Sequence, residues 1–222
     1  GNPLVADPPE IKVHLSRRTS PERITVIPYG AEDIRSADTA PVTALGLEPG
    51  RYLSVIARAE PENSLLEIVE GFSRKPRGMK LAVLGKYEDS NAYHQAVKAA
   101  AGNEVMFLGA IYDKKVVQAL RFHSAAYVHG HQVGGTNPSL VEALGAGNAV
   151  IAHDNRFNRW VAGPGAAFFD GAAGFATQLD AILADPTRLD SMRKASRERF
   201  LAEFQWEKIL SEYETLLLKY QK

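Results

Sequence analysis

The segment from His129 to Ser139, HGHQVGGTNPS, carries residue types well suited to binding a ligand. Gly134 and Gly135 let the backbone approach a bound group closely because they have no side chain. Asn137 is a favourable cap and Pro138 suits a first helical turn, so the sequence predicts a helix that begins here. Its free amides and the positive end of its dipole favour a bound diphosphate. The alternative is an ordinary glycine-rich loop, since such loops alone are weak motifs.

Glu142 lies about one turn into the predicted helix, near the face that carries Pro138 and Ser139. Its carboxylate can accept hydrogen bonds from the two hydroxyls of a ribose. A ligand with both a ribose and a diphosphate would be a nucleotide. The alternative is a glutamate on a helix surface that binds no ligand.

Arg58 directly follows the apolar run from Tyr52 to Ile56 and Ala57. In an open parallel sheet, ligands bind beyond the carboxyl ends of the strands, which is where Arg58 would lie. A guanidinium can hold phosphate oxygens with paired hydrogen bonds and can stabilise charge on a departing diphosphate. The alternative is a surface arginine paired with Glu60 or Glu62.

A third strand end, from Gly109 to Asp113, follows the apolar run Val105 to Leu108. It offers apolar atoms and backbone groups on which a nucleobase can rest. We predict that Tyr112 packs in the core or at the rim rather than stacking on the base, as a lone tyrosine in such a loop usually does.

The sequence does not favour a metal or a dinucleotide. His129, His131 and Asn137 lie close together, but no carboxylate or third imidazole stands at ligand spacing, so we expect no metal. No Asp-x-Asp pair of the kind that holds magnesium against a diphosphate is present. An oxidoreductase that binds a dinucleotide is disfavoured because no Gly-x-Gly-x-x-Gly follows the first strand.

The composition is that of an ordinary globular protein of 222 residues, in which 26 Lys and Arg balance 26 Asp and Glu. This balance gives no field that favours nucleic acid, so we expect no nucleic-acid partner. The absence of cysteine excludes disulfides, thiolate zinc sites and cysteine nucleophiles. With no membrane span or export signal in the sequence, we expect a cytoplasmic location, at the inner face of the membrane if another part of the protein or the acceptor holds it there.

The elements that must position these residues form an alternating pattern of apolar runs and amphipathic helices. Near-continuous apolar strands predict a parallel sheet covered on both faces, hence an α/β fold with a doubly wound, Rossmann-like sheet and extra helices after Gly171. The predicted strands of this sheet are Tyr52 to Ile56, Met79 to Leu84, Val105 to Leu108, Ala125 to Val128 and Ala149 to Ala152.

We divide the chain into three parts. Residues 1–50 are a junction segment, with a helix from Pro8 to Arg18, a strand from Ile24 to Ile27 and a connecting arm from Ala31 to Gly50. Residues 51–204 form the sheet domain, and residues 205–222 form a bracing helix.

The order of these motifs resembles the C-terminal domain of family 4 glycosyltransferases, which have the two-domain GT-B architecture. Within that family it is most similar to the bacterial rhamnosyltransferase branch, in which Gly-Gly-Thr-Asn-Pro-Ser precedes the glutamate. The resemblance covers nearly the whole chain. It rests on the segments Arg58 to Asn63, Phe107 to Gly109 and His131 to Gly147.

The resemblance implies that Glu142 binds the ribose of a nucleotide-sugar donor and that Arg58 holds its phosphates and acts in catalysis. Gly134 stands where family members usually carry a first glutamate, so no side chain recognises the sugar there. Asn63 replaces a common lysine, which removes a positive charge from the phosphate site. The full predicted donor site comprises Asn63, Gly109, Tyr112, His131, Gly134, Gly135, Thr136, Asn137, Pro138, Ser139 and Glu142.

The implied activity is sugar transfer from a nucleotide diphosphate sugar, with rhamnose as a candidate sugar, with retention of configuration and without metal or another cofactor. The acceptor, a saccharide or a lipid-linked molecule, would be brought by a missing N-terminal domain, so this chain alone would turn over poorly. Two alternatives remain open: a non-catalytic module that binds nucleotide sugars, and a GT-B nucleotide-sugar epimerase.

Overall fold

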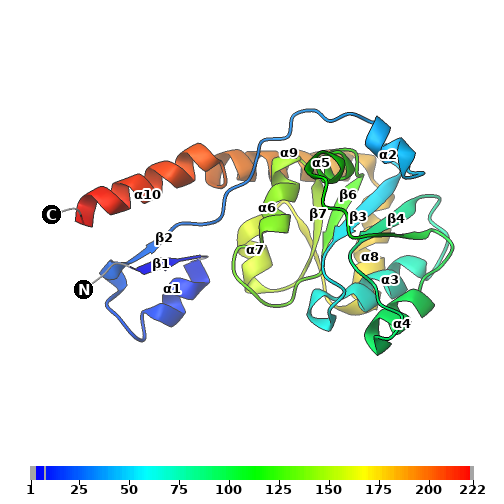
Figure 1. The fold of residues 1–222 in the computed structure, drawn as a ribbon, viewed down its shortest axis with the longest axis horizontal. Coiled ribbons are helices and arrows are strands. Elements are labelled where there is room, and N and C mark those ends of the chain that lie inside the picture. The colour runs from blue at the N-terminus through cyan, green and yellow to red at the C-terminus, as the bar shows by residue number, and fades with distance from the viewer. Residues whose placement is uncertain (1–3, 8, 221–222) are drawn as a thin grey trace.

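The computed structural model describes residues 4–7 and 9–220 and shows a sheet domain with a narrower part beside it (Figure 1). The sheet domain contains six parallel strands in the order β5-β4-β3-β6-β7-β8. These strands are β3 (Tyr52–Ile56), β4 (Lys80–Leu84), β5 (Val105–Gly109), β6 (Ala126–His129), β7 (Ala149–His153) and β8 (Ala167–Phe169). The predicted doubly wound, Rossmann-like α/β fold is therefore confirmed.

Helices cover both faces of the sheet because each strand is followed by a crossover segment. One face packs against α3 (Leu65–Ser73), α4 (Ala92–Ala99) and α8 (Gly171–Leu183), with Leu53, Val55, Phe72 and Phe175 in its core. The other face packs against α2 (Ala40–Ala44), α5 (Lys114–Phe122), α6 (Pro138–Gly145), α7 (Arg156–Ala162) and α9 (Pro186–Glu203). Residues that alternate along β3 thus fill two separate cores.

The strand order reverses between β3 and β6, which are neighbours in the sheet. From β3 the chain winds outward through β4 and β5, and from β6 it winds in the opposite direction through β7 and β8. A crevice forms at the carboxyl ends of strands at such a reversal point, and ligands bind there. The segments that follow β3 and β6 are those that contain Arg58 and the glycine-rich loop.

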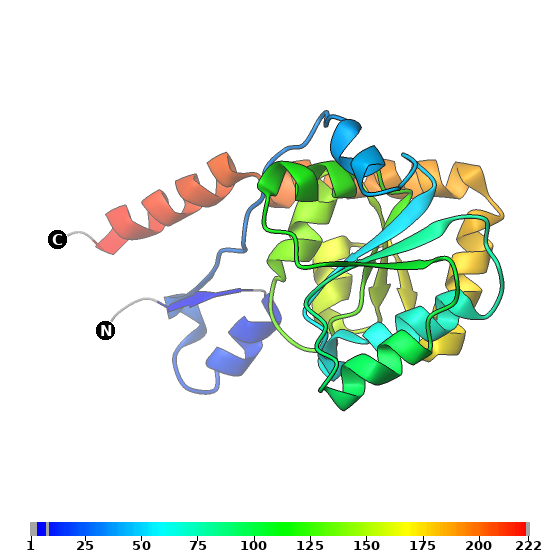
Figure 2. The same cartoon turned by 45° about the vertical axis from the view of Figure 1, so that its right-hand side comes forward.

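The narrower part contains a small parallel unit, in which β1 (Leu4–Ala6), α1 (Pro9–Leu15), the 3₁₀ turn η1 (Pro21–Arg23) and β2 (Ile24–Val26) follow one another. The predicted helix and strand are both found, and β1 adds a strand that the sequence analysis missed. The last helix, α10 (Trp206–Tyr220), runs beside this unit (Figure 2). Ile27, Ile209 and Leu216 form the small core between them.

The connecting arm predicted from Ala31 to Gly50 packs on the sheet domain. Val42 of α2 is completely buried and Leu47 is nearly so. The Ile34 amide donates a 3.0 Å hydrogen bond to the Gly145 carbonyl at the end of α6. The packed body therefore begins before Arg51.

Among the described residues, no helix is long and apolar enough to cross a membrane.

Candidate functional site

A cleft of about 460 Å³ opens at the carboxyl ends of β3, β4 and β6. Arg58, the start of α6 and Glu142 all line it, so the three groups on which the sequence interpretation depended lie around one space. Among the described residues, its lining is Ile56, Ala57, Arg58, Leu84, Gly85, Lys86, Ala110, Ile111, Tyr112, Arg121, Asn137, Pro138, Ser139 and Glu142.

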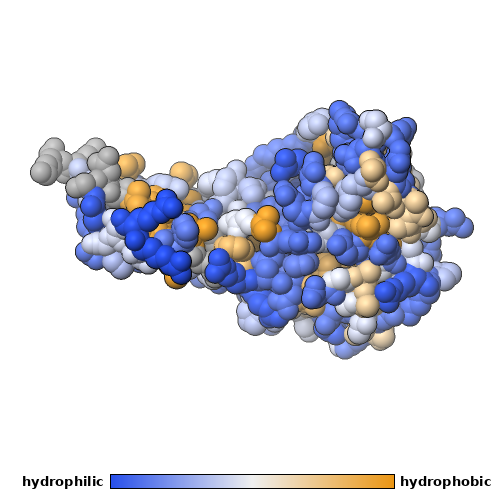
Figure 3. All heavy atoms as spheres, turned by 90° about the horizontal axis from the view of Figure 1, so that it is seen from below, coloured by the Kyte–Doolittle hydropathy of each residue, from blue (hydrophilic) through white to orange (hydrophobic). Residues whose placement is uncertain are grey.

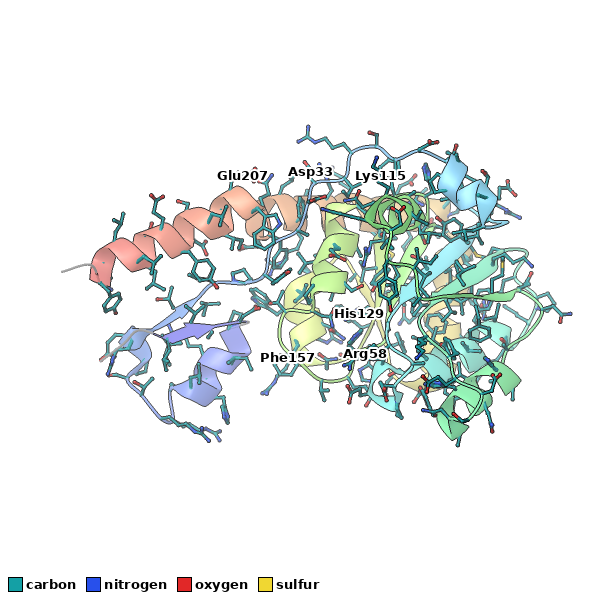
Figure 4. All side chains as sticks on the ribbon, in the orientation of Figure 1. Asp33, Arg58, Lys115, His129, Phe157 and Glu207 are labelled. Atoms are coloured by element: carbon teal, nitrogen blue, oxygen red, sulfur yellow. The ribbon has the colours of Figure 1, made fainter. Side chains whose placement is uncertain are left out.

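Arg58 occupies an exposed turn that is tied to the neighbouring strand. The side chain of Asn63 donates a 2.9 Å hydrogen bond to the Arg58 carbonyl, and the hydroxyl of Ser64 donates one of 2.8 Å to the Gly130 carbonyl. The Arg58 guanidinium is 82% exposed and lies 4.0 Å from Glu62. An exposed pair at this distance contributes little, so the guanidinium is available to an anion. Figure 4 shows Arg58 beneath the ends of the strands, in the same region as His129.

The start of α6 has the predicted capping geometry. The side chain of Asn137 accepts a 3.0 Å hydrogen bond from the Ser139 amide, and Pro138 occupies the first turn. In the preceding loop, Gly134 has a φ of +128°, in the region that favours glycine. Gly135 and Thr136 lead into the cap, and the Thr136 side chain is buried.

A buried arginine that the sequence analysis missed connects the residues of this cleft. Nη2 of Arg121 in α5 lies 2.6 Å from Oε2 of Glu142 and donates a 2.9 Å hydrogen bond to Oγ of Ser139. The same Oγ lies 2.6 Å from the hydroxyl of Tyr127 in β6. Glu142 keeps 45% of its side chain exposed, whereas Arg121 keeps only 7%.

Two stacked histidines lie beside the glycine-rich loop. The rings of His129 and His131 are 4.3 Å apart, and neither ring nitrogen of His129 has a partner among the described residues. Burial, helped by neighbouring positive groups, holds the pKa of His129 well below its ordinary value. Burial and the nearby charge of Arg58 lower the pKa of His131 to about 4. His131 supports the loop through its carbonyl, which accepts hydrogen bonds from Asn155 and Asn158.

Three other predicted site residues lie in different settings. Asn63 is 2% exposed and does not line the cleft, so its side chain supports the Arg58 turn instead of facing a ligand. Gly109 ends β5 with a φ of +72° just before the lining residues. Tyr112 is 90% exposed and lines the cleft, so of the two predicted positions, core or rim, it occupies the rim.

A second cleft of about 450 Å³ adjoins the first. The two share Ile111, Tyr112, Arg121 and Glu142, which places Glu142 at their boundary. The second cleft extends between α5 and the segment that joins the narrow unit to the sheet domain, where Tyr29, Glu32 and Trp206 line it.

The first cleft also contains a cation that the sequence analysis did not assign. Lys86, directly after β4, lines it and pairs with Glu88 at 2.7 Å, and its side chain is 75% exposed. Among the described residues, no group of three or more His, Cys, Asp or Glu is placed to hold a metal ion.

Solved structures share this fold at low sequence identity. HepE of Anabaena, in a complex with UDP, matches with a TM-score of 0.86 at 14% identity over 99% of this chain and 64% of its own. A sucrose-phosphate synthase from Thermosynechococcus elongatus matches with a TM-score of 0.81 at 19% identity, over 97% of this chain and 57% of its own. A glycosyltransferase from Rickettsia africae matches with a TM-score of 0.81 at 16% identity, over 97% of this chain and 64% of its own. The chain therefore spans 57% to 64% of the length of these three structures. No curated protein sequence matches it significantly.

The family model for glycosyl transferases group 1 matches residues 45–199, which is more than half of the chain. This region contains the complete six-stranded sheet and every residue of the first cleft. The chain therefore belongs to the glycosyl transferases group 1 family and carries its C-terminal type of domain.

Proposed function

We propose that this chain binds the nucleoside diphosphate part of a nucleotide-sugar donor and serves a glycosyltransferase. The observation that carries the proposal is the convergence of Arg58, the amino end of α6 and Glu142 on one cleft. A guanidinium and helix amides suit phosphate oxygens, and a carboxylate suits ribose hydroxyls. The structure of HepE in a complex with UDP supports a donor of this class.

The cleft suggests how the donor is oriented. Glu142 lies at the boundary of the two clefts, so a ribose bound to it would direct the diphosphate toward Arg58 and the start of α6. Lys86 also lines this cleft and would supply a second positive charge for the phosphates. The base would extend along Ile111 and Tyr112, which line both clefts.

In the proposed reaction, the bond between the anomeric carbon and the diphosphate oxygen breaks, and the bonding electrons leave with the diphosphate. Arg58 and the amides of α6 stabilise this charge, which lowers the barrier if they do so more strongly in the transition state. An acceptor hydroxyl then forms the new glycosidic bond and loses its proton. We further propose transfer with retention, without a metal or other cofactor, within family 4 and its rhamnosyltransferase branch, with rhamnose as the candidate sugar.

A second domain would supply the acceptor, a saccharide or a lipid-linked molecule. This part of the proposal is supported by the neighbours, of which the chain spans only 57% and 64% in the first two. The narrow part carries apolar side chains among polar ones, as Figure 3 shows for one face. Exposed apolar residues there include Val13, Leu210, Leu217 and Leu218. We place the reaction in the cytoplasm, at the inner face of the membrane where the acceptor is lipid-linked.

Calorimetric titration with UDP, dTDP and GDP sugars, and with the matching free diphosphates, tests the proposal. We expect one base to be preferred and the nucleotide sugar to be distinguished from its diphosphate. Absence of binding to every nucleotide would refute the donor role. Release of free sugar without an acceptor would indicate an epimerase, and nucleotide binding without transfer in the full-length protein would indicate a non-catalytic module.

A further inference from the structure

Arg121 is a buried arginine at the point where the two clefts meet. It belongs to the last turn of α5, is 5% exposed and lines both clefts. Burying a guanidinium is costly unless polar groups surround it. Its partners therefore show what the protein gains by keeping a charge in this position.

Those partners are two cleft residues on α6. One nitrogen, Nη2, contacts both Oγ of Ser139 at 2.9 Å and Oε2 of Glu142 at 2.6 Å. The Tyr127 hydroxyl lies 2.6 Å from Oγ of Ser139, on strand β6. The guanidinium thus joins the first turn of α6 to the carboxylate one turn later.

The backbone around Arg121 is itself fixed. The buried side chain of Asn148 donates a 2.7 Å hydrogen bond to the Arg121 carbonyl. The buried hydroxyl of Tyr52 donates one of 2.7 Å to the carbonyl of Leu120. The backbone that carries Arg121 is therefore fixed from the core side. The guanidinium contacts Ser139 and Glu142 through Nη2, while its buried Nε has no hydrogen-bond partner among the described residues, and 45% of the Glu142 side chain is exposed on the solvent side.

A half-exposed glutamate without a partner samples many rotamers, and ordering it on binding costs free energy. In this protein Oε2 is already bound to Arg121, and within residues 4–7 and 9–220 no side chain donates a hydrogen bond to Oε1. The ion pair therefore holds the carboxylate at the boundary of the two clefts and leaves one oxygen available to a ligand.

We infer that Arg121 is a positioning residue that orients the Glu142 carboxylate toward the ribose hydroxyls of the bound nucleoside diphosphate. The inference rests on the proposed function and adds a specificity to it: recognition of the ribose hydroxyls requires both residues. Arg121 acts through Glu142 and Ser139 and need not touch the ligand.

Calorimetry with the 222-residue chain first identifies which nucleoside diphosphate, UDP, dTDP, GDP or ADP, binds most tightly. The test then compares that nucleoside diphosphate with its 2′,3′-dideoxy counterpart, again by calorimetry. We expect the wild type to prefer the form with hydroxyls by roughly 10- to 100-fold, the range for a hydrogen bond to a charged group. Arg121→Met should remove this preference while it leaves the affinity for the dideoxy form within about twofold. Glu142→Gln should have the same effect, and the double variant should lose nothing further.

Arg77→Met is the matched control, because Arg77 is also buried, also pairs with a carboxylate, that of Asp180, and lies outside both clefts. It should lower stability and keep the full hydroxyl preference. If Arg121→Met does not fold, Arg121→Lys replaces it, and we expect a reduced preference because one ammonium cannot reproduce the planar guanidinium.

Equal weakening of both nucleotide forms, or a retained preference in the Arg121 variants, would overturn the inference and assign Arg121 a structural role alone. A wild type that binds both forms equally would overturn it too, while donor binding would stand. A wild type that binds no nucleotide would instead overturn the proposed function, and the inference with it.

Discussion

The side chain of Asn63 donates a 2.9 Å hydrogen bond to the carbonyl of Arg58, so the residue that fixes the turn is buried directly behind the residue exposed to the cleft. The Glu60 amide donates to the same carbonyl at 2.8 Å. Gly130 packs against this turn so closely that a Cβ added there would lie 2.0 Å from the Asn63 carbonyl oxygen. The Arg58 turn is therefore held both by its own residues and by the end of β6.

Replacing Asn63 with alanine should loosen this turn. We expect the free energy of unfolding to fall by about 1 kcal/mol, because one partly buried hydrogen bond is lost while the Glu60 amide still satisfies the Arg58 carbonyl. Affinity for the nucleoside diphosphate should fall as well, since Arg58 is less well ordered. Urea denaturation and calorimetry measure the two effects. Asn103→Ala, at an exposed position, should change neither, and an unchanged Asn63→Ala protein would refute the supporting role.

Arg58→Ala should weaken binding of the diphosphate in particular. A charge-assisted hydrogen bond is worth about 1.5 to 3 kcal/mol, so we expect roughly 10- to 100-fold lower affinity for a nucleoside diphosphate and little change for the nucleoside. In the full-length protein, the transition state should lose on the order of 2 to 4 kcal/mol. Arg74→Ala, at an exposed arginine beyond the opposite end of α3, is the control. Unchanged turnover of the full-length Arg58→Ala variant would contradict the role.

Lys86→Ala should also reduce affinity for the diphosphate, and the loss should shrink as salt is added because Lys86 is exposed. We expect an effect of about 1 kcal/mol or less, smaller than that of Arg58→Ala, since a flexible ammonium acts as a point charge. Lys98→Ala is the matched control, because Lys98 forms a similar 2.7 Å ion pair with Asp89 and does not line the cleft. Equal effects of the two variants at several salt concentrations would show that Lys86 does not face the ligand.

Acid should destabilise the protein through His131. Its pKa is about 4 in the folded chain and near the ordinary value of 6.5 when unfolded, so between these values the unfolded state binds more protons. Stability is therefore constant above pH 6.5 on this account and falls as the pH drops from 6.5 toward 4. The His131 contribution should be on the order of 2 to 3 kcal/mol.

Urea denaturation of the wild type and of His131→Gln across this range measures that contribution. The variant should show a flatter dependence on pH, and His14→Gln, at an exposed histidine, should follow the wild type. Parallel curves for the wild type and His131→Gln would show that the buried imidazole does not cause the acid sensitivity.

The sequence predicted the sheet well because its strands are buried on both faces and therefore appear as continuous apolar runs. β3 was predicted with its correct bounds, and β4 to β7 to within one residue at each end. β1 and β8, each three residues long, were missed. Packing of the segment before Arg51 was missed because Val42 and Leu47 are isolated apolar residues in a stretch rich in turn formers.

The sequence predicted the position of a site residue correctly where neighbouring residues in the chain determine that position. It did not do so where packing between distant segments determines it. The capping pattern of Asn137 and Pro138 is local, and so is the position of Arg58 after a strand. Spacing could not show that Asn63 turns inward or that Tyr112 points outward. Arg121 lies on a different helix from Glu142, and only the arrangement of α5 beside α6 brings them together.

Gly30 packs against Trp206 so closely that an added Cβ would lie 2.8 Å from the indole ring, and Ala31 forms an isolated bridge with Gln205. The chain thus passes between the two parts of the molecule twice, and both crossings lie at the same place. It enters the sheet domain near Gly30 and leaves it near Trp206. Torsion changes confined to the few residues around these crossings would reorient the narrow part without breaking a strand pairing of the six-stranded sheet. Any reorientation of the narrow part would therefore have to accommodate the contact between Gly30 and Trp206.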